Sequence, residues 1–150
     1  MKKQFNKAII GTISHCTMRE EDLIESFIDE LIRLNNNKRT YKSIINEGKA
    51  IIKKGEYDTE YTSSFLNETL WDALNDFSPF LCYFGSSEGD GSDFGFWPYG
   101  DTDGFDGLKV NDLSEVPEKY TGGVLYVNDH GNTSLYISKK GKLEEIWSIV

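Results

Sequence analysis

The sequence has few cysteines, no long apolar run and almost no basic residue in its middle. Cys16 and Cys82 are its only two cysteines. Two are too few for a disulfide framework, and we expect free thiols in a reducing cytoplasm. No stretch approaches the roughly 20 apolar residues of a membrane-spanning helix, so no membrane association is expected. The basic start MKKQFNK precedes a short apolar run without a clear cleavage site, so no signal peptide is predicted.

Composition nevertheless favours a folded protein. Hydrophobic residues make up 38% of the chain and aromatic residues 13%, which is enough apolar surface to build a core and argues against general disorder. A length of 150 residues is typical of one domain. We therefore expect a single domain over residues 1–150.

The charge is unevenly placed along the chain. Residues 1–54 carry 11 Lys/Arg against 7 Asp/Glu, whereas residues 55–112 carry only Lys109 against 13 acids. Such segregation produces a field of one sign over part of the surface. Direct binding of a nucleic-acid backbone by the middle region is disfavoured, because that binding requires cations. A basic partner is favoured.

Residues 80–107, FLCYFGSSEGDGSDFGFWPYGDTDGFDG, contain seven glycines and six acids, which lie between and after two apolar flanks. Aromatic residues alternating with small or polar ones are typical of a half-buried sheet, and glycines permit tight turns. This pattern predicts a β-hairpin with an acidic turn and exit loop.

Apolar periodicity predicts three helices, at residues 20–34, 40–54 and 60–77. Thr17 and Glu20 fit a capping box before the first, Gly55 is expected to end the second, and Gly48 weakens the second by about 1 kcal/mol relative to alanine. Residues 8–13 are expected to form a short strand or an arm lying on the core. Further strands are expected in the hairpin and in a meander at 123–128, 134–138 and 143–150, after an irregular segment at 110–120. The fold class is therefore α+β, with about three helices packed on a mostly antiparallel sheet of four to five strands.

Two sets of carboxylates are the candidate partner-binding residues. The helix acids are Glu68, Asp72 and Asp76, and the hairpin acids are Glu88, Asp90 and Asp93. The helix acids repeat at i, i+4 and i+8, so they share one helix face, and their simplest reading is a solvated face. Phe96 and Trp97 are the aromatic candidates, because aromatic residues beside complementary charge recur at interfaces. Packing in the core is the competing interpretation of Phe96 and Trp97.

The cluster Asp101, Asp103, Asp106 and Asp112 partly matches a calcium loop. Asp101, Asp103 and Asp112 fall at positions 1, 3 and 12, but Phe105 and Asp106 stand at positions 5 and 6, where a ligand and a glycine belong. A solvated, glycine-rich turn is the favoured reading. We expect no metal or other cofactor, with calcium as the weak alternative.

Catalytic patterns are sparse. No C-x-x-C pair or H-E-x-x-H motif occurs. Adjacent His15 and Cys16 should not form a dyad in a strand, since successive side chains point to opposite faces. We therefore predict no catalytic residues and lean towards a protein that is not an enzyme.

Two segments carry a resemblance. Gly11–Ser14 followed by Thr17-Met-Arg-x-Glu21-Asp-Leu23, and Tyr83-Phe-Gly85 followed by EGDG-x-DFGFW at residues 88–97, resemble an unnamed family of small acidic proteins of phage and bacterial genomes. The resemblance implies no activity or catalytic residue. It implies a phage or mobile-element protein acting in the bacterial cytoplasm.

These observations lead to three hypotheses. The leading one is an acidic inhibitor or counter-defence protein whose acidic surface occupies the basic nucleic-acid channel of a host protein. The second is a binder of a small ligand or signalling nucleotide, using the hairpin aromatics and the basic second helix. The third is an enzyme whose site is not recognisable from the sequence.

Overall fold

A computed structural model describes residues 8–79, 81–99 and 105–149. The chain divides into two compact units, Met1–Pro98 and Tyr99–Val150. Helices and mostly antiparallel strands confirm the α+β class. The strands form two sheets, one in each unit, where one sheet was expected. The single domain expected over residues 1–150 stays a prediction. Within the described residues, no helix is both long and apolar enough to cross a membrane.

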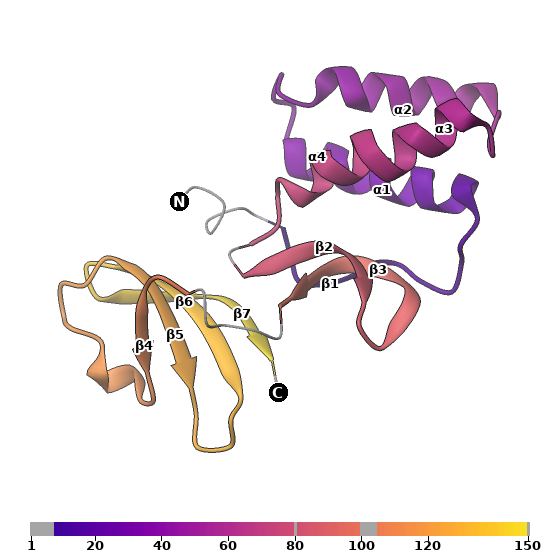
Figure 1. The fold of residues 1–150 in the computed structure, drawn as a ribbon. Coiled ribbons are helices and arrows are strands. Elements are labelled where there is room, and N and C mark those ends of the chain that lie inside the picture. Colours follow the sequence, from indigo (N-terminus) through magenta and orange to yellow (C-terminus); the bar gives the residue numbers. More distant parts are fainter. Residues whose placement is uncertain (1–7, 80, 100–104, 150) are drawn as a thin grey trace. The chain divides into compact units, whose positions relative to one another are not determined.

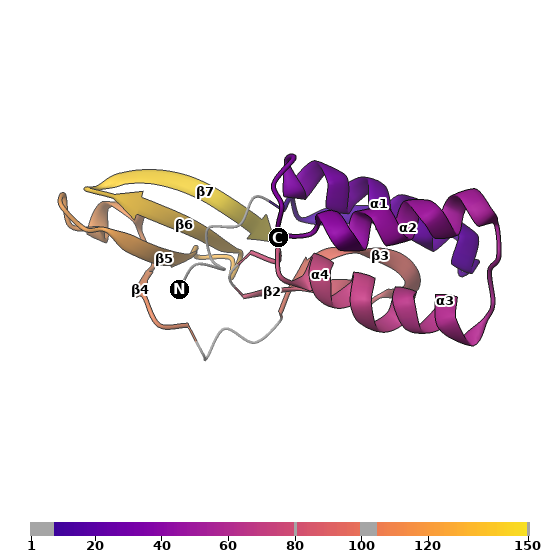
Figure 2. The same cartoon turned by 90° about the horizontal axis from the view of Figure 1, so that it is seen from above.

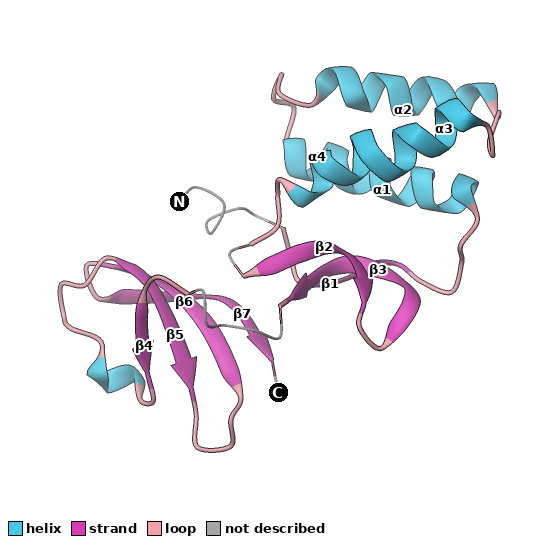
Figure 3. Ribbon diagram, viewed as in Figure 1, coloured by secondary structure: helices cyan, strands magenta, loops and turns pink. Residues whose placement is uncertain are grey.

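The first unit has a three-stranded antiparallel sheet under a layer of helices (Figure 1). Its strands are β1 (Gly11–Ser14), β2 (Cys82–Ser87) and β3 (Asp90–Pro98), in the order β1-β3-β2. The β2–β3 pair is the predicted hairpin, and it aligns Tyr83 with Trp97. Figure 3 shows the helices of this unit gathered on one face of the sheet.

Helix α1 (Glu20–Asn35) confirms the first predicted helix, but the predicted capping box is wrong. The N-cap residue is Arg19, and its side chain makes no capping bond. Thr17 Oγ1 donates instead to Asp22 Oδ2 at 2.7 Å. Glu20 is engaged elsewhere, because its carboxylate accepts from Asp58 N and Ser63 Oγ, both at 2.8 Å. Glu20 therefore makes hydrogen bonds to residues distant in the sequence, in place of the local capping bond that was predicted.

Helix α2 (Lys42–Lys54) runs alongside α1 (Figure 2). It ends at Gly55, whose φ of 70° is the left-handed conformation that glycine adopts readily. The structure also explains Gly48. A Cβ there would lie 2.1 Å from Cδ1 of Ile28, so the missing side chain allows α2 to approach α1. Close packing compensates for the lower helix propensity.

The third helical run has three segments, α3 (Glu60–Ser64), the π-helical η2 (Phe65–Leu70) and α4 (Trp71–Asn75). Thr59 begins it, accepting the N–H of Thr62 at 3.0 Å. The π-helical segment was not predicted, because apolar periodicity does not distinguish an extra residue per turn. The run otherwise follows the helix expected at 60–77.

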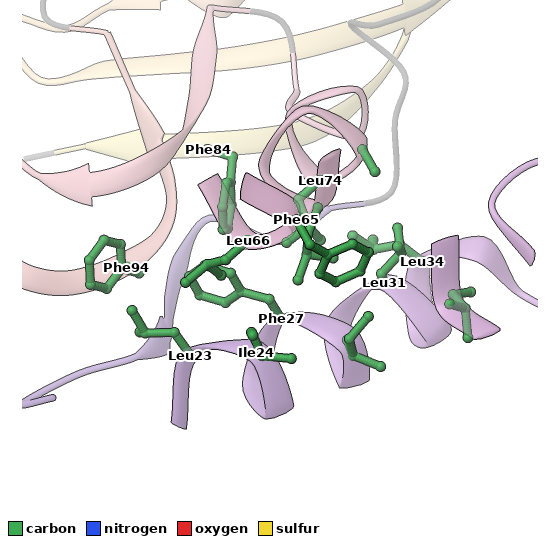
Figure 4. Packing of buried hydrophobic residues seen from close by; sticks show 14 of the residues in the cluster. Leu23, Ile24, Phe27, Leu31, Leu34, Phe65, Leu66, Leu74, Phe84 and Phe94 are labelled. Carbon is green, nitrogen blue, oxygen red and sulfur yellow. The ribbon is translucent and has the colours of Figure 1, made fainter. Parts of the chain in front are cut away.

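The core of the first unit lies between the helices and the sheet. Phe27 from α1 packs edge-on against Phe84 and Phe94 of the hairpin, at centroid distances of 5.0 and 5.8 Å. Leu31, Leu70 and Leu74 are fully buried beside them. Figure 4 shows this packing at close range. Aromatic pairs of this geometry contribute about 0.5–1.5 kcal/mol each beyond their burial.

The second unit has a four-stranded sheet in the order β4-β5-β6-β7. Its strands are β4 (Leu108–Val110), β5 (Gly122–Val127), β6 (Thr133–Lys139) and β7 (Lys142–Ile149), with the short helix η3 (Leu113–Glu115) after β4. Strands β5 to β7 form the predicted antiparallel meander. Strand β4, which pairs with β5 in parallel, was not predicted; it ends at Val110, where the segment expected to be irregular begins.

Candidate functional site

The helix acids lie on the solvent side of the third helical run. Glu68, Asp72 and Asp76 are all exposed, whereas Phe65, Leu66, Leu70, Ala73 and Leu74 on the other side are buried. The helical repeat therefore separates the carboxylates from the core, as their spacing predicted.

Asp76 also links two helices. The Tyr41 hydroxyl, just before α2, donates to Asp76 Oδ2 at 2.6 Å. Burial raises the pKa of Tyr41 to about 12, and this hydrogen bond and the charge of Asp76 add to the effect. Asp76 is thus held in place, whereas Glu68 and Asp72 form no ion pair within the described residues.

Two of the hairpin acids are exposed at the turn that joins β2 to β3. Asp90 Oδ1 accepts from Ser92 N at 3.0 Å and from Ser92 Oγ at 2.9 Å. The backbone bond and then the hydroxyl bond lower the pKa of Asp90, and the charge of His15 lowers it further. Glu88 is exposed beside it. The lowered pKa of Asp90 keeps the Asp90 carboxylate ionised at this turn.

Asp93 is the least usual of the six acids. It is half-buried, and its Oδ1 is buried with no hydrogen-bond partner among the described residues. The β2–β3 register shifts between Ser86 and Ser87, opposite this part of β3. Irregularities of this kind re-aim side chains. A buried carboxylate oxygen without a donor is unfavourable by about 1–3 kcal/mol or more.

The helix acids and the hairpin acids both belong to the first unit. Helix α4 contacts β2, and the Trp71 ring lies edge-on to Phe84 and Phe94, at centroid distances of 5.1 and 5.9 Å. Aromatic packing therefore holds the helix against the hairpin. Asp106 and Asp112 belong to the other unit.

The structure corrects the role expected for Phe96. This ring is completely buried and packs against Phe84, with centroids 5.3 Å apart. It belongs to the core and has no surface for a partner. Trp97 is half-buried, and its Nε1 donates to Gly85 O at 2.9 Å. Phe84 and Phe94 are also buried, so these three hairpin aromatics build the core.

The calcium-loop candidates are only partly described. Asp101 and Asp103 lie outside the described residues, and Asp106 is exposed. Asp112 Oδ1 accepts from Ser114 N at 2.9 Å at the start of η3, and this bond lowers the pKa of Asp112. Capping a short helix accounts for Asp112. Within the described part of the chain, no three His, Cys, Asp or Glu side chains gather as metal ligands would.

The expectation that His15 and Cys16 point apart is wrong. Cys16 lies beyond the end of β1 and has a left-handed φ of 64°, so the strand alternation does not apply. Cys16 Sγ is 3.1 Å from His15 Nδ1, and both residues are exposed. Both cysteines are free thiols, as predicted, and burial raises the pKa of Cys82 to about 12.

Several hollows open on the described surface of the first unit. One, of about 590 Å³, lies between β1 and α1, and its polar wall includes Asp29, Glu30 and Arg33. The guanidinium of Arg33 is bonded to both carboxylate oxygens of Glu30, at 2.8 and 2.6 Å. The charged groups that line this hollow are thus largely paired within the protein.

Another hollow, which we call the lysine pocket, has a volume of about 240 Å³. Its lining combines lysines, asparagines and two isoleucines from α1, α2 and the loop between them: Ile32, Asn35, Asn37, Lys38, Lys42, Ile45, Asn46 and Lys49. Sequence reasoning recognised the basic character of this helix but not the pocket. The available signal was the i, i+4, i+7 spacing of Lys42, Asn46 and Lys49, which places them on one helix face.

No protein-family model, curated protein or solved structure matches this chain.

Proposed function

We propose that this chain is an acidic binding protein that inhibits a basic partner by occupying its nucleic-acid-binding surface. The exposed carboxylates of the first unit carry the proposal, because Glu68, Asp72, Glu88 and Asp90 lie at the surface and form no ion pair within the described residues. A guanidinium or ammonium group of a partner would form charge-assisted hydrogen bonds with these carboxylates, which are stronger than neutral ones.

The half-buried Asp93 adds a further charge, because it too forms no ion pair within the described residues. Surface carboxylates that compete with phosphate groups for a basic channel would attract its lysines and arginines over a distance of about 8–10 Å at ordinary ionic strength.

The proposed setting is a phage-borne protein acting on a host protein in the bacterial cytoplasm. It rests on the family resemblance of the T-M-R-x-E-D-L and EGDG-x-DFGFW segments. The small-ligand alternative loses support from the hairpin aromatics, since Phe84, Phe94 and Phe96 are core residues, and it retains only the lysines of α2. The enzyme alternative remains a hypothesis without an assigned site.

Affinity capture from a bacterial lysate at low salt tests the proposed function. The bait is the full chain, and the matched control is a six-acid variant in which the helix acids and hairpin acids become Gln or Asn. These changes keep side-chain shape and hydrogen-bonding capacity. We expect a basic nucleic-acid-binding protein to be retained by the natural chain and lost with the variant. Retention of the same proteins by both baits would contradict the proposal.

A further inference from the structure

The lysine pocket is a built feature rather than a chance grouping of flexible side chains. Its floor includes Ile45 and Asn35, both buried. Asn35 Nδ2 donates to Lys38 O at 2.7 Å, and Lys38 N donates to Asn35 O at 3.0 Å. These two bonds fix the loop that carries Lys38 against the end of α1.

The charge of the pocket is of one sign. Lys38, Lys42 and Lys49 line it and no Asp or Glu does, although the whole chain has a net charge of −9. None of the three lysines forms an ion pair with the described residues. Like charges around a small hollow repel one another, and a bound anion would relieve that repulsion.

The first helical position of α2 also belongs to the pocket, through Lys42. Tyr41 precedes the helix without capping it by a side chain, and the first turn contains no acid. A helix N-terminus favours anions, yet here the sequence places a lysine at the first helical position. An anion beside Lys42 would complement both the lysine and the helix dipole.

The size of the pocket limits its ligand. A volume of about 240 Å³ is below the roughly 300–1,000 Å³ of clefts that enclose drug-sized molecules. The pocket therefore suits one or two phosphate groups better than a whole nucleotide. We propose that the lysine pocket binds a small phosphate-bearing anion, held by Lys38, Lys42, Lys49 and the amide of Asn46.

Calorimetric titration of the full chain with inorganic pyrophosphate in a chloride buffer tests this proposal. We expect saturable binding that weakens at least tenfold, or about 1.4 kcal/mol, in a Lys42→Gln/Lys49→Gln variant. Asn46→Asp, which places a carboxylate in the pocket at nearly unchanged shape, should abolish binding. The matched control is Lys53→Gln/Lys54→Gln, which removes the same charge from the same helix outside the pocket and should stay within about twofold, or roughly 0.4 kcal/mol.

Parallel titration with ADP separates the sources of phosphate. Equal affinity for ADP and pyrophosphate would assign recognition to the phosphate groups alone, whereas tighter ADP binding would show that the pocket mouth also contacts the nucleoside. Absence of saturable pyrophosphate binding would overturn the proposal. An equal loss of pyrophosphate affinity in the Lys53→Gln/Lys54→Gln control would also overturn the proposal. It would show that binding depends on the overall charge of α2 and not on the pocket. A melt of each variant confirms that it is folded.

Discussion

Gly95 lies so close to Gly11 that a side chain at Gly95 would collide with the backbone of β1. A Cβ built there would be 1.9 Å from Gly11 O and 2.8 Å from its carbonyl carbon. Strand β1 therefore pairs with β3 only because residue 95 has no side chain. This contact gives a structural reason for the glycine in the DFGFW segment, which begins with the half-buried Asp93.

Replacing Gly95 by alanine should destabilise the first unit. The obstacle is backbone rather than a movable side chain, so we expect a loss of about 1–3 kcal/mol, as for other overpacked sites. Urea denaturation of the full chain measures the change. The matched control is Gly91→Ala, since a Cβ at Gly91 meets nothing within 4 Å, and it should stay within about 0.5 kcal/mol. Equal stability of the two variants would show that β1 does not need the close contact.

Asp93→Asn should affect folding and binding in opposite directions. Removing a carboxylate whose buried oxygen has no donor should leave the free protein equally stable or up to about 1 kcal/mol more stable. Binding of a basic partner should weaken, because one charge of the acidic surface is lost. Denaturant melts and a binding titration provide the two readouts. The control for both is Glu144→Gln, which removes an exposed carboxylate outside the six acids. A destabilised Asp93→Asn variant would argue that Asp93 has a structural role.

The two thiols should react very differently. Cys16 is exposed, whereas Cys82 is buried with its pKa raised to about 12. Because the thiolate is the nucleophile, Cys82 should be almost inert at neutral pH. A disulfide reagent should therefore label one thiol in the native protein and two in denaturant, and mass spectrometry should locate the first label at Cys16. Rapid native labelling of Cys82 would mean that the hairpin opens readily.

Tyr41 should make stability depend on pH in the alkaline range. Its pKa is raised from 10.0 to about 12 in the folded protein, mainly by burial and then by its bond to Asp76. A raised pKa means that the folded state favours the protonated phenol, so this contribution is complete below pH 10 and falls as the pH rises through about 12. Tyr41→Phe should flatten this part of the stability profile. Ultraviolet titration of the phenol checks the pKa, and an ordinary value would remove the expected difference.

Sequence patterns predicted what depends on side-chain periodicity. The apolar stripe containing Phe27 and Leu31 identified α1, and the aromatic alternation from Phe84 to Phe96 identified the hairpin. The same aromatic residues show where this reasoning ends. Alternation places a ring on one face of a sheet but does not say which face the helices cover, so Phe96 was expected at a surface and lies in the core.

Features set by single backbone angles or by tertiary contacts could not be predicted from the sequence. The left-handed conformation of Cys16 brings its thiol to His15, and nothing in the local sequence indicates it. The sequence could not show that Glu20 does not cap α1, because its actual partners, Asp58 and Ser63, are distant in the sequence. The lysine pocket required the juxtaposition of α1 and α2. The exposure of Glu68, Asp72 and Asp76, by contrast, followed directly from their spacing.

Competition for nucleic acid tests the central claim most directly. A labelled oligonucleotide is bound to the basic protein captured from the lysate, and its fluorescence anisotropy is followed as this chain is added. We predict displacement of the oligonucleotide, weakening steeply with salt, and at least a tenfold loss of potency, about 1.4 kcal/mol, in the six-acid variant. A stable ternary complex with the oligonucleotide still bound, or equal displacement by the six-acid variant with the same salt dependence, would contradict inhibition through the acidic surface.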